Sequence, residues 1–314
     1  MVKIAFWDNA LGERGTSVSL YDYAHFNETI LGNTSIILYD SMCESNSSAV
    51  IEKFKKRFDV FGLMNWSDVD NTLIANGCDI LYIIKGGNND GKFSKVCKTC
   101  VHCVFTTYEP HGDVYAPISS WIYGNEDGKY PVVPHMVYLP ESRDNMRLEL
   151  DIPEDAVVFG RHGGFQQFDI PYVQKTVYEV ALENPHIYFV FVNTQQFCPP
   201  IHNIKHLDTI VDLNEKVRFI DTCDAMLWGR SDGESFGLSI GEFSIKNKPV
   251  FATQIGYQSH IHLLKEKAIW YNEGSIKNLL TTFDSENAKK QDWNAYRDYT
   301  PENVMSIFKK VFID

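Results

Sequence analysis

Long hydrophobic runs are missing from this 314-residue chain, and none approaches the roughly 20 apolar residues that a membrane-spanning helix needs. The apolar residues that follow Met1 are also too few for the core of a signal peptide. We therefore expect a cytoplasmic protein with at most peripheral membrane contact.

Positive charge is scarce as well. The chain has 29 Lys and Arg residues against 41 Asp and Glu residues, which gives a formal net charge of -12. This balance argues against a nucleic-acid partner and against a polybasic membrane-binding protein. Any anionic ligand must then be bound by a few local positive groups and by backbone N–H donors.

The usual nucleotide-phosphate fingerprints are absent from the loop after the first apolar run. Residues 8–17 contain Gly12 and Gly15 but form neither Gly-x-Gly-x-x-Gly nor a P-loop, which disfavours a nicotinamide oxidoreductase. The loop still leads into a helix start, where free amides favour an anion. We expect Gly15 and Thr16 to contact a ligand, although the glycines could simply form a tight turn.

A disulfide framework is not expected either, because seven cysteines is an odd number in a long, non-secreted chain. Cys97, Cys100 and Cys103, with His102, have a spacing that could place thiolates on a metal ion. No second ligand pair follows at a suitable distance. We therefore favour a buried strand over residues 101–107, with Cys103 as a small core residue, and expect no metal site.

What the sequence does contain is a regular alternation of apolar runs and helical patterns. Helix signals extend from Thr16 or Ser17 to Gly32 and from Ser67 to Gly77. Nearly continuous apolar runs between helices are typical of parallel, doubly wound sheets in α/β proteins. The runs are residues 2–6, 36–39, 60–64, 80–84 and 101–107, then 157–160, 187–192, 225–228, 249–252 and 268–271.

A proline-rich stretch, residues 131–140, separates the two series of runs. With 44% hydrophobic residues, the chain can fill two cores, so we expect two Rossmann-like domains that face each other across a cleft. The expected domains are residues 1–138 and 139–298. Thr300 as an N-cap and Pro301 at the first helical position predict a closing helix in residues 299–314, which would pack back on the N-terminal domain.

Two loops that follow predicted strands carry charged groups suited to a ligand. In residues 108–113, His111 lies among Glu109 and Asp113, a set suited to polar recognition or proton transfer. In residues 160–164, Arg161 could reach a phosphate with its planar guanidinium. The alternatives are an ordinary surface histidine and a surface arginine that caps a turn.

The loop of residues 228–242 has the strongest pattern. A strand ends near Trp228, Glu234 follows in a glycine-containing loop, and a helix is expected to begin near Phe236 and Gly237. Free amides at that helix start can hold an anion. Glu242 lies more than one turn into the helix, so two carboxylates flank the anion site. That arrangement suits a ligand with phosphates in the middle and hydroxylated rings at both ends, such as a sugar nucleotide.

The motif Glu234-x7-Glu242, followed by Lys248-Pro249-Val250, resembles the Glu-x7-Glu region of retaining glycosyltransferases with the GT-B fold, especially family 4. The resemblance implies transfer of a sugar from a nucleoside-diphosphate sugar to a hydroxyl of a glycan, lipid or small molecule. It further implies retention of the anomeric configuration, with no metal or other cofactor.

By this resemblance, Glu234 and the following amides would hold the donor sugar and its diphosphate. Glu242 would bind the ribose, Arg161 the diphosphate, and His111 the transferred sugar from the acceptor side. The expected catalytic residues are His111, Glu234, Arg161 and Arg230. The expected donor-binding residues are Gly15, Thr16, Arg161, Arg230, Glu234, Ser235, Phe236, Gly237, Leu238 and Glu242.

The sequence departs from this family at one position. Such enzymes usually carry a Lys several residues after the Arg, but here Gln166 and Gln167 occupy that stretch. We expect Arg230 to supply the missing positive charge.

Two other functions stay open. A sugar-nucleotide-binding protein without transfer activity would use the same residues. A metal-dependent transferase of the single-domain GT-A type would need an Asp-x-Asp metal site, which Asp68 and Asp70 match formally. These two residues fit better as a helix cap and a first-turn acidic residue.

Overall fold

The computed structural model describes residues 1–125, 127–142 and 144–314. The chain divides into two compact units, which are described separately. The first contains residues 1–136 and 298–314, and the second contains residues 137–297.

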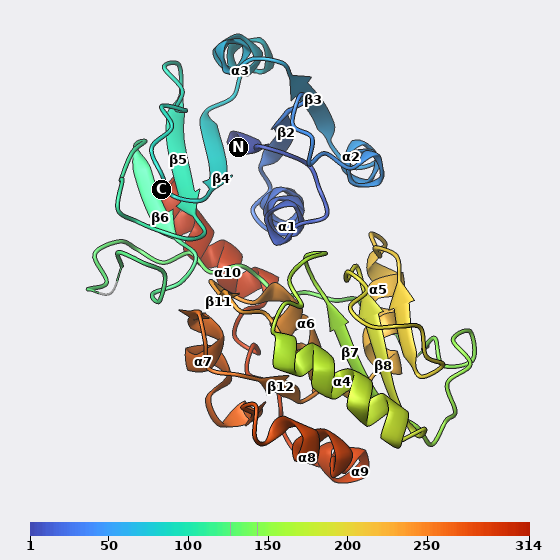
Figure 1. The fold of residues 1–314 in the computed structure, drawn as a ribbon. Helices are drawn as coiled ribbons and strands as arrows, with labels where there is room; N and C mark the ends of the chain where they lie inside the picture. The colour runs from blue at the N-terminus through green and yellow to red at the C-terminus, as the bar shows by residue number, and fades with distance from the viewer. Residues whose placement is uncertain (126, 143) are drawn as a thin grey trace. The chain divides into compact units, whose positions relative to one another are not determined.

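The first unit is built on a six-stranded sheet in which every neighbouring pair of strands is parallel. The strand order is β3-β2-β1-β4-β5-β6. This is the doubly wound order, in which the direction of strand addition reverses between β1 and β4. Helices cover the sheet, as Figure 1 shows. The elements are β1 (Lys3–Asp8), α1 (Gly15–Thr29), β2 (Thr34–Asp40), α2 (Ser48–Lys55), β3 (Asp59–Leu63), a 3₁₀ turn (Trp66–Asp68), α3 (Val69–Asn76), β4 (Ile80–Lys85), β5 (Lys98–Cys103) and β6 (Val114–Pro117).

The second unit repeats this plan. Its main sheet has the order β14-β12-β10-β7-β8-β9, again all parallel, so the reversal lies between β7 and β10. The elements before the reversal are β7 (Val157–His162), α4 (Pro171–Glu183), β8 (Ile187–Val192), β9 (Ile204–Leu207) and α5 (Leu213–Thr222). Those that follow are β10 (Ala225–Leu227), β11 (Gly233–Glu234), α6 (Leu238–Ile245), β12 (Val250–Ala252), β13 (Tyr257–Gln258), α7 (Ser259–Leu264), a 3₁₀ turn (Lys265–Lys267), β14 (Ala268–Trp270), α8 (Ile276–Thr281) and α9 (Ser285–Ala288).

The predicted α/β class is confirmed, and the ten predicted apolar runs overlap all strands of the two six-stranded sheets except β6 and β9. Both of these missed strands lie at sheet edges. β6 ends in Pro117 and β9 contains Lys205 and His206, so neither has the apolar pattern of a central strand. The strand expected over residues 101–107 is wrong at its C-terminal boundary, because β5 already ends at Cys103.

The closing helix α10 (Pro301–Phe308), followed by a π turn (Lys309–Ile313), belongs to the first unit. The Thr300 hydroxyl accepts a hydrogen bond from the Asn303 amide at 3.4 Å, as expected of an N-cap. Phe308 stacks on Tyr23 of α1, with ring centroids 5.2 Å apart. Figure 1 shows α10 in red beside the blue and cyan elements of this unit.

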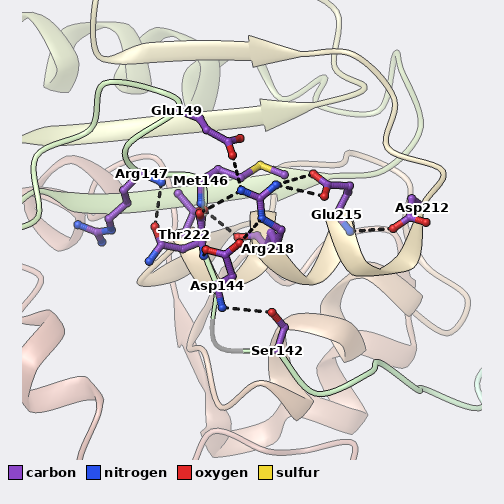
Figure 2. A network of polar contacts seen from close by, with 10 residues as sticks. Ser142, Asp144, Met146, Arg147, Glu149, Asp212, Glu215, Arg218 and Thr222 are labelled. Carbon is purple, nitrogen blue, oxygen red and sulfur yellow. Dashed lines mark hydrogen bonds and ion pairs between the residues drawn. The ribbon is translucent and has the colours of Figure 1, made fainter.

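The segment that leads into the second sheet is anchored by two arginines of different burial (Figure 2). Arg147 is 7% exposed, pairs with Asp224 at 3.0 Å, and donates to the carbonyl oxygens of residues 153, 154 and 156. Arg218 of α5 joins Asp144, Glu149 and Glu215, whose side chains are 71%, 57% and 46% exposed. Water therefore solvates the partners of Arg218 but is largely excluded from the Arg147–Asp224 pair.

No helix in the described ranges is both long and apolar enough to cross a membrane.

Replacing these two arginines should separate a buried ion pair from an exposed one. Arg147→Met leaves the Asp224 carboxylate unpaired in the interior, so it should lower the free energy of unfolding by about 3–5 kcal/mol. Arg218→Met should cost clearly less, because its carboxylate partners stay hydrated. Urea unfolding followed by circular dichroism measures both. Equal losses for the two variants would contradict this assignment.

Candidate active site

The candidate site lies at the switch point of the second sheet, between β7 and β10, where the order of the strands reverses. Arg161 is at the carboxyl end of β7, and Arg230 and Glu234 lie in the loop that follows β10, the neighbouring strand. In doubly wound sheets ligands bind outside the carboxyl ends of the strands at this reversal. The structure thus brings together two of the loops predicted from the sequence, residues 160–164 and 228–242, at the carboxyl ends of neighbouring strands.

Arg161 is 4% exposed and is held by neutral acceptors. One guanidinium nitrogen donates to the Thr194 hydroxyl at 2.6 Å and to the Asn193 carbonyl at 3.3 Å, and the other donates to the Gly164 carbonyl at 3.0 Å. Burial lowers the pKa of Arg161 from 12.5 to about 10, and the nearby Glu234 carboxylate opposes this shift. The guanidinium therefore stays charged at neutral pH while its orientation is restrained.

Glu234 is held by an indole and by a looser arginine contact. The Trp228 Nε1–H donates to Oε1 at 2.9 Å, and an Arg230 guanidinium nitrogen lies 3.4 Å from Oε2. Trp228 is itself fixed by the His260 ring, 4.6 Å away between centroids, and by the Tyr271 hydroxyl, which donates to its carbonyl. This arrangement restrains one carboxylate oxygen firmly and the other only weakly.

Arg230 is not fully satisfied by these contacts. Its Nε is buried and makes no hydrogen bond to any residue that the structure describes. Its remaining ion pair, to Asp232, is 3.5 Å long, and the Asp232 side chain is exposed. The charge of Arg230 also contributes to the lowered pKa of Arg161, so the two guanidiniums lie close enough to repel each other. Both guanidiniums lie near Glu234, and neither forms a short ion pair with a carboxylate in the described part of the chain, so positive charge is available to an anion.

The loop between Glu234 and α6 is shaped by glycine. Gly237 caps α6 with φ of +85°, a left-handed conformation that a side chain would disfavour. The Tyr296 hydroxyl donates to the Phe236 carbonyl at 2.8 Å, and the Ser259 hydroxyl donates to the Ser235 carbonyl at 2.7 Å. The first amides of a helix lack intrahelical partners, so the start at Leu238 provides donors next to Glu234.

Glu242, 4% exposed in α6, is ion-paired within the protein. Lys216 Nζ of α5 donates to Oε1 at 2.8 Å, and His162 Nε2 at the end of β7 lies 2.9 Å from Oε2. This close contact is not a well-formed hydrogen bond, because His162 Nε2 makes none with the described residues. Burial would raise the pKa of Glu242, but Lys216 and His162 outweigh it and lower the pKa from 4.5 to about 2.

The first loop of the first unit is organised around its own carboxylate. Asp8 ends β1, is 1% exposed, and has its pKa raised by burial, although the Arg14 guanidinium 3.0 Å away opposes the shift. Gly15 begins α1, and the Thr16 hydroxyl is buried beside Asp8 without a well-formed hydrogen bond. Contact of Gly15 and Thr16 with a ligand stays a prediction.

His111 lies in the connection between β5 and β6, three residues before β6 begins. Its Nδ1 is 2.7 Å from the Glu109 carbonyl, and its Nε2 is 3.1 Å from Lys85 Nζ at the end of β4. A lysine ammonium can only donate, so Nε2 accepts and Nδ1–H donates to the carbonyl. Lys85 also pairs with Asp90. With both ring nitrogens engaged, His111 is less available for proton transfer than an isolated loop histidine.

The two metal hypotheses gain no support from the described ranges, which contain no group of three His, Cys, Asp or Glu residues placed to hold an ion. Cys100 and Cys103 are buried in β5, where burial raises the pKa of each thiol to about 12. Asp70 accepts from the Ser94 hydroxyl at 2.8 Å and from the Lys95 amide, which is a structural role.

Three side chains of this site escaped the sequence analysis: Trp228, as the partner of Glu234, Thr194, as the partner of Arg161, and Lys216, as the partner of Glu242. A further missed carboxylate, Asp169, accepts from the Ser231 amide at 2.7 Å and hydroxyl at 2.6 Å, and so fixes the loop that carries Arg230. Trp228 and Asp169 lie in loops after strands, which is a usable signal, whereas Lys216 lies in a helix far from any motif.

The fold is that of an α/β protein with two units, each built on a doubly wound parallel sheet. No family model matches the chain, and no curated protein matches its sequence. Solved structures do match. A glycosyltransferase from Rickettsia africae ESF-5 has a TM-score of 0.69 at 12% identity, over 100% of this chain and 99% of its own. HepE from Anabaena, in complex with UDP-glucose, has a TM-score of 0.70 at 13% identity, over 99% and 96%.

A third similar structure comes from Listeria monocytogenes and is described as a UDP-N-acetylglucosamine 2-epimerase. Its TM-score is 0.64 at 13% identity, over 98% of this chain and 96% of its own. Identities this low establish the architecture alone: the chain has the GT-B fold.

The ion pairs of Glu242 predict a specific dependence of stability on pH. Because the folded-state pKa of about 2 is below the ordinary 4.5, the ionised group stabilises the fold above pH 4.5, by roughly 3 kcal/mol. This contribution is lost as the pH falls toward 2. Glu242→Gln should therefore be less stable than the wild type at pH 7, and the gap should narrow by pH 3. Urea unfolding at pH 7, 5, 4 and 3 tests this, and a gap independent of pH would contradict it.

Proposed function

We propose that the protein transfers a sugar from a nucleoside-diphosphate sugar to a hydroxyl acceptor, with retention of configuration and without a metal. The observation that carries the proposal is the meeting of Arg161, Arg230, Glu234 and the start of α6 at the reversal of the second sheet. The fold that the chain shares with a glycosyltransferase and with a protein in complex with UDP-glucose supports it.

The diphosphate would bind to Arg161, Arg230 and the first amides of α6. Arg161 is already oriented by neutral acceptors, so little reorganisation is needed when an anion arrives. The buried, unbonded Nε of Arg230 is an unused donor of the same site. As the bond to the sugar breaks, charge grows on the leaving diphosphate, and both guanidiniums would stabilise it more strongly in the transition state.

The two carboxylates would accept hydrogen bonds from neutral hydroxyls at either end of the donor. Glu234 would hold the transferred sugar, since the weak Arg230 contact leaves Oε2 with acceptor capacity. Glu242 would hold the ribose. No protein nucleophile is required in this scheme, because the leaving diphosphate can take the acceptor's proton on the face from which it departs.

On the first unit, we propose that the polar group around His111 contacts the transferred sugar from the acceptor side. Lys85 joins His111 in this assignment because its ammonium lies 3.1 Å from the imidazole. The acceptor would be a glycan or another molecule with a free hydroxyl. Gly15 and Thr16 keep their proposed contact with the donor.

Two alternatives use the same donor site. A binding protein without turnover would hold the nucleotide sugar unchanged, and the Listeria structure favours a second candidate activity, epimerisation of a UDP-sugar. Both keep the roles of Arg161 and Arg230 but remove the need for an acceptor.

Incubation with radiolabelled UDP-glucose and a panel of hydroxyl acceptors should yield a labelled glycoside and UDP, in EDTA as well as without it. NMR of the product should show the anomeric configuration of the donor. An inverted product would reject retention, and activity lost in EDTA but restored by manganese would reject metal independence. The second candidate activity would instead be established if no acceptor became labelled and UDP-N-acetylglucosamine were converted to its epimer.

Arg161→Ala and Arg230→Ala should each weaken binding of UDP by roughly 10- to 150-fold, since each removes a charged hydrogen-bond donor from the diphosphate. Isothermal titration calorimetry measures the loss. Arg297→Ala is the matched control, because it removes an arginine with a 53% exposed side chain from an ion pair elsewhere in the second unit. If Arg230→Ala binds UDP like the control, another group must replace the missing lysine.

A further inference from the structure

The Glu242 carboxylate is enclosed by charged or polar groups from two other elements. Lys216 Nζ from α5 lies 2.8 Å from Oε1, and His162 Nε2 from β7 lies 2.9 Å from Oε2. The exposed fractions of the side chains are 6% for Glu242 and 12% for both partners. Such limited contact with water leaves the ion pair of Lys216 and Glu242 poorly screened, so the attraction between these two groups is strong.

This triad, defined as Lys216, His162 and Glu242, lies directly beside the proposed donor site. His162 follows Arg161 on β7, and Glu242 is in the second turn of α6, whose start borders Glu234. Lys216 is near the start of α5. The triad therefore connects the strand that carries Arg161 to the helix that begins four residues after Glu234.

We propose that Lys216 and His162 are positioning residues that hold Glu242 as a fixed, ionised acceptor for the ribose hydroxyls of the donor nucleotide. The inference rests on the proposed function, because it needs a bound ribonucleotide. A carboxylate has about four lone-pair sites. Each partner approaches a different oxygen, so each oxygen keeps acceptor capacity for one hydroxyl of a vicinal pair.

Burial alone would favour the protonated carboxyl, in which one oxygen becomes a donor and the stronger hydrogen bonds to a charged acceptor are lost. The groups that oppose protonation are Lys216 from α5 and His162 from β7, and Arg161 and Lys216 in turn act on His162. Burial lowers the pKa of His162, which keeps this imidazole mostly neutral near pH 7. The ammonium of Lys216 is therefore the main charge that keeps Glu242 ionised, and its loss should make ribose recognition sensitive to pH.

The test compares a ribonucleoside diphosphate with its 2′-deoxy counterpart by calorimetry between pH 5 and 8. The base is the one that the wild type binds best among UDP, ADP, GDP and CDP. The wild type should prefer the ribonucleotide about 10-fold or more, as expected for a lost hydrogen bond to a charged group, at every pH. In Lys216→Met the preference should be smaller at pH 8 and approach one at pH 5.

Two variants serve as controls. Lys216→Arg keeps a cation opposite Glu242 and should restore a preference that does not change with pH. Lys246→Met removes a lysine from a comparable ion pair, 2.9 Å from Asp221, with side chains 19% and 17% exposed. It should leave the preference as in the wild type. A purely structural role of Lys216 would instead weaken both nucleotides alike and leave their ratio unchanged.

If Lys216→Met does not fold, the double variant Lys216→Met with Glu242→Gln removes both buried charges, and it should bind the two nucleotides equally at all pH values. A wild-type preference in either variant at every pH would overturn the inference while leaving the proposed function intact. A wild type that binds nucleoside diphosphates without preferring ribose would do the same. A wild type that binds none of the four would overturn both.

Discussion

The candidate site depends on keeping positive charge in a buried position of an acidic chain. The chain has a formal net charge of -12, yet Arg161 is 4% exposed and its hydrogen bonds go to neutral oxygens. A charge that is buried and only distantly compensated is costly unless a ligand completes its environment. Arg230 adds a second guanidinium nearby, and the two share the attraction of Glu234. An anion with two charges would compensate the positive charge of the two guanidiniums.

The two carboxylates beside these cations have different environments. Glu234 is oriented by the Trp228 indole and touched loosely by Arg230, so its remaining acceptor capacity is open to change. Glu242 is ion-paired to Lys216 and contacts His162, so its charge and position are set by the protein. The environment of Glu234 suits the proposed contact with a transferred sugar, which must be released in each cycle. The environment of Glu242 suits the proposed recognition of the ribose, which does not react.

Much of the fold could be predicted because parallel strands buried on both faces leave continuous apolar runs in the sequence. β6 and β9 could not, since edge strands tolerate Pro117, Lys205 and His206. The positions of Arg161, Arg230 and Glu234 followed from a simple rule, that loops after parallel strands gather at one edge. Lys216 did not, because which face of α5 meets Glu242 depends on tertiary packing rather than on spacing. For His111, the sequence could not reveal that Lys85, 26 residues earlier, would engage its second nitrogen.

The most direct measurement is a crystal structure of the chain with bound UDP. The diphosphate oxygens should lie about 3 Å from the guanidinium nitrogens of Arg161 and Arg230 and from the first amides of α6, the distance of a charged hydrogen bond. A diphosphate bound elsewhere, with neither arginine in contact, would contradict the proposed donor site.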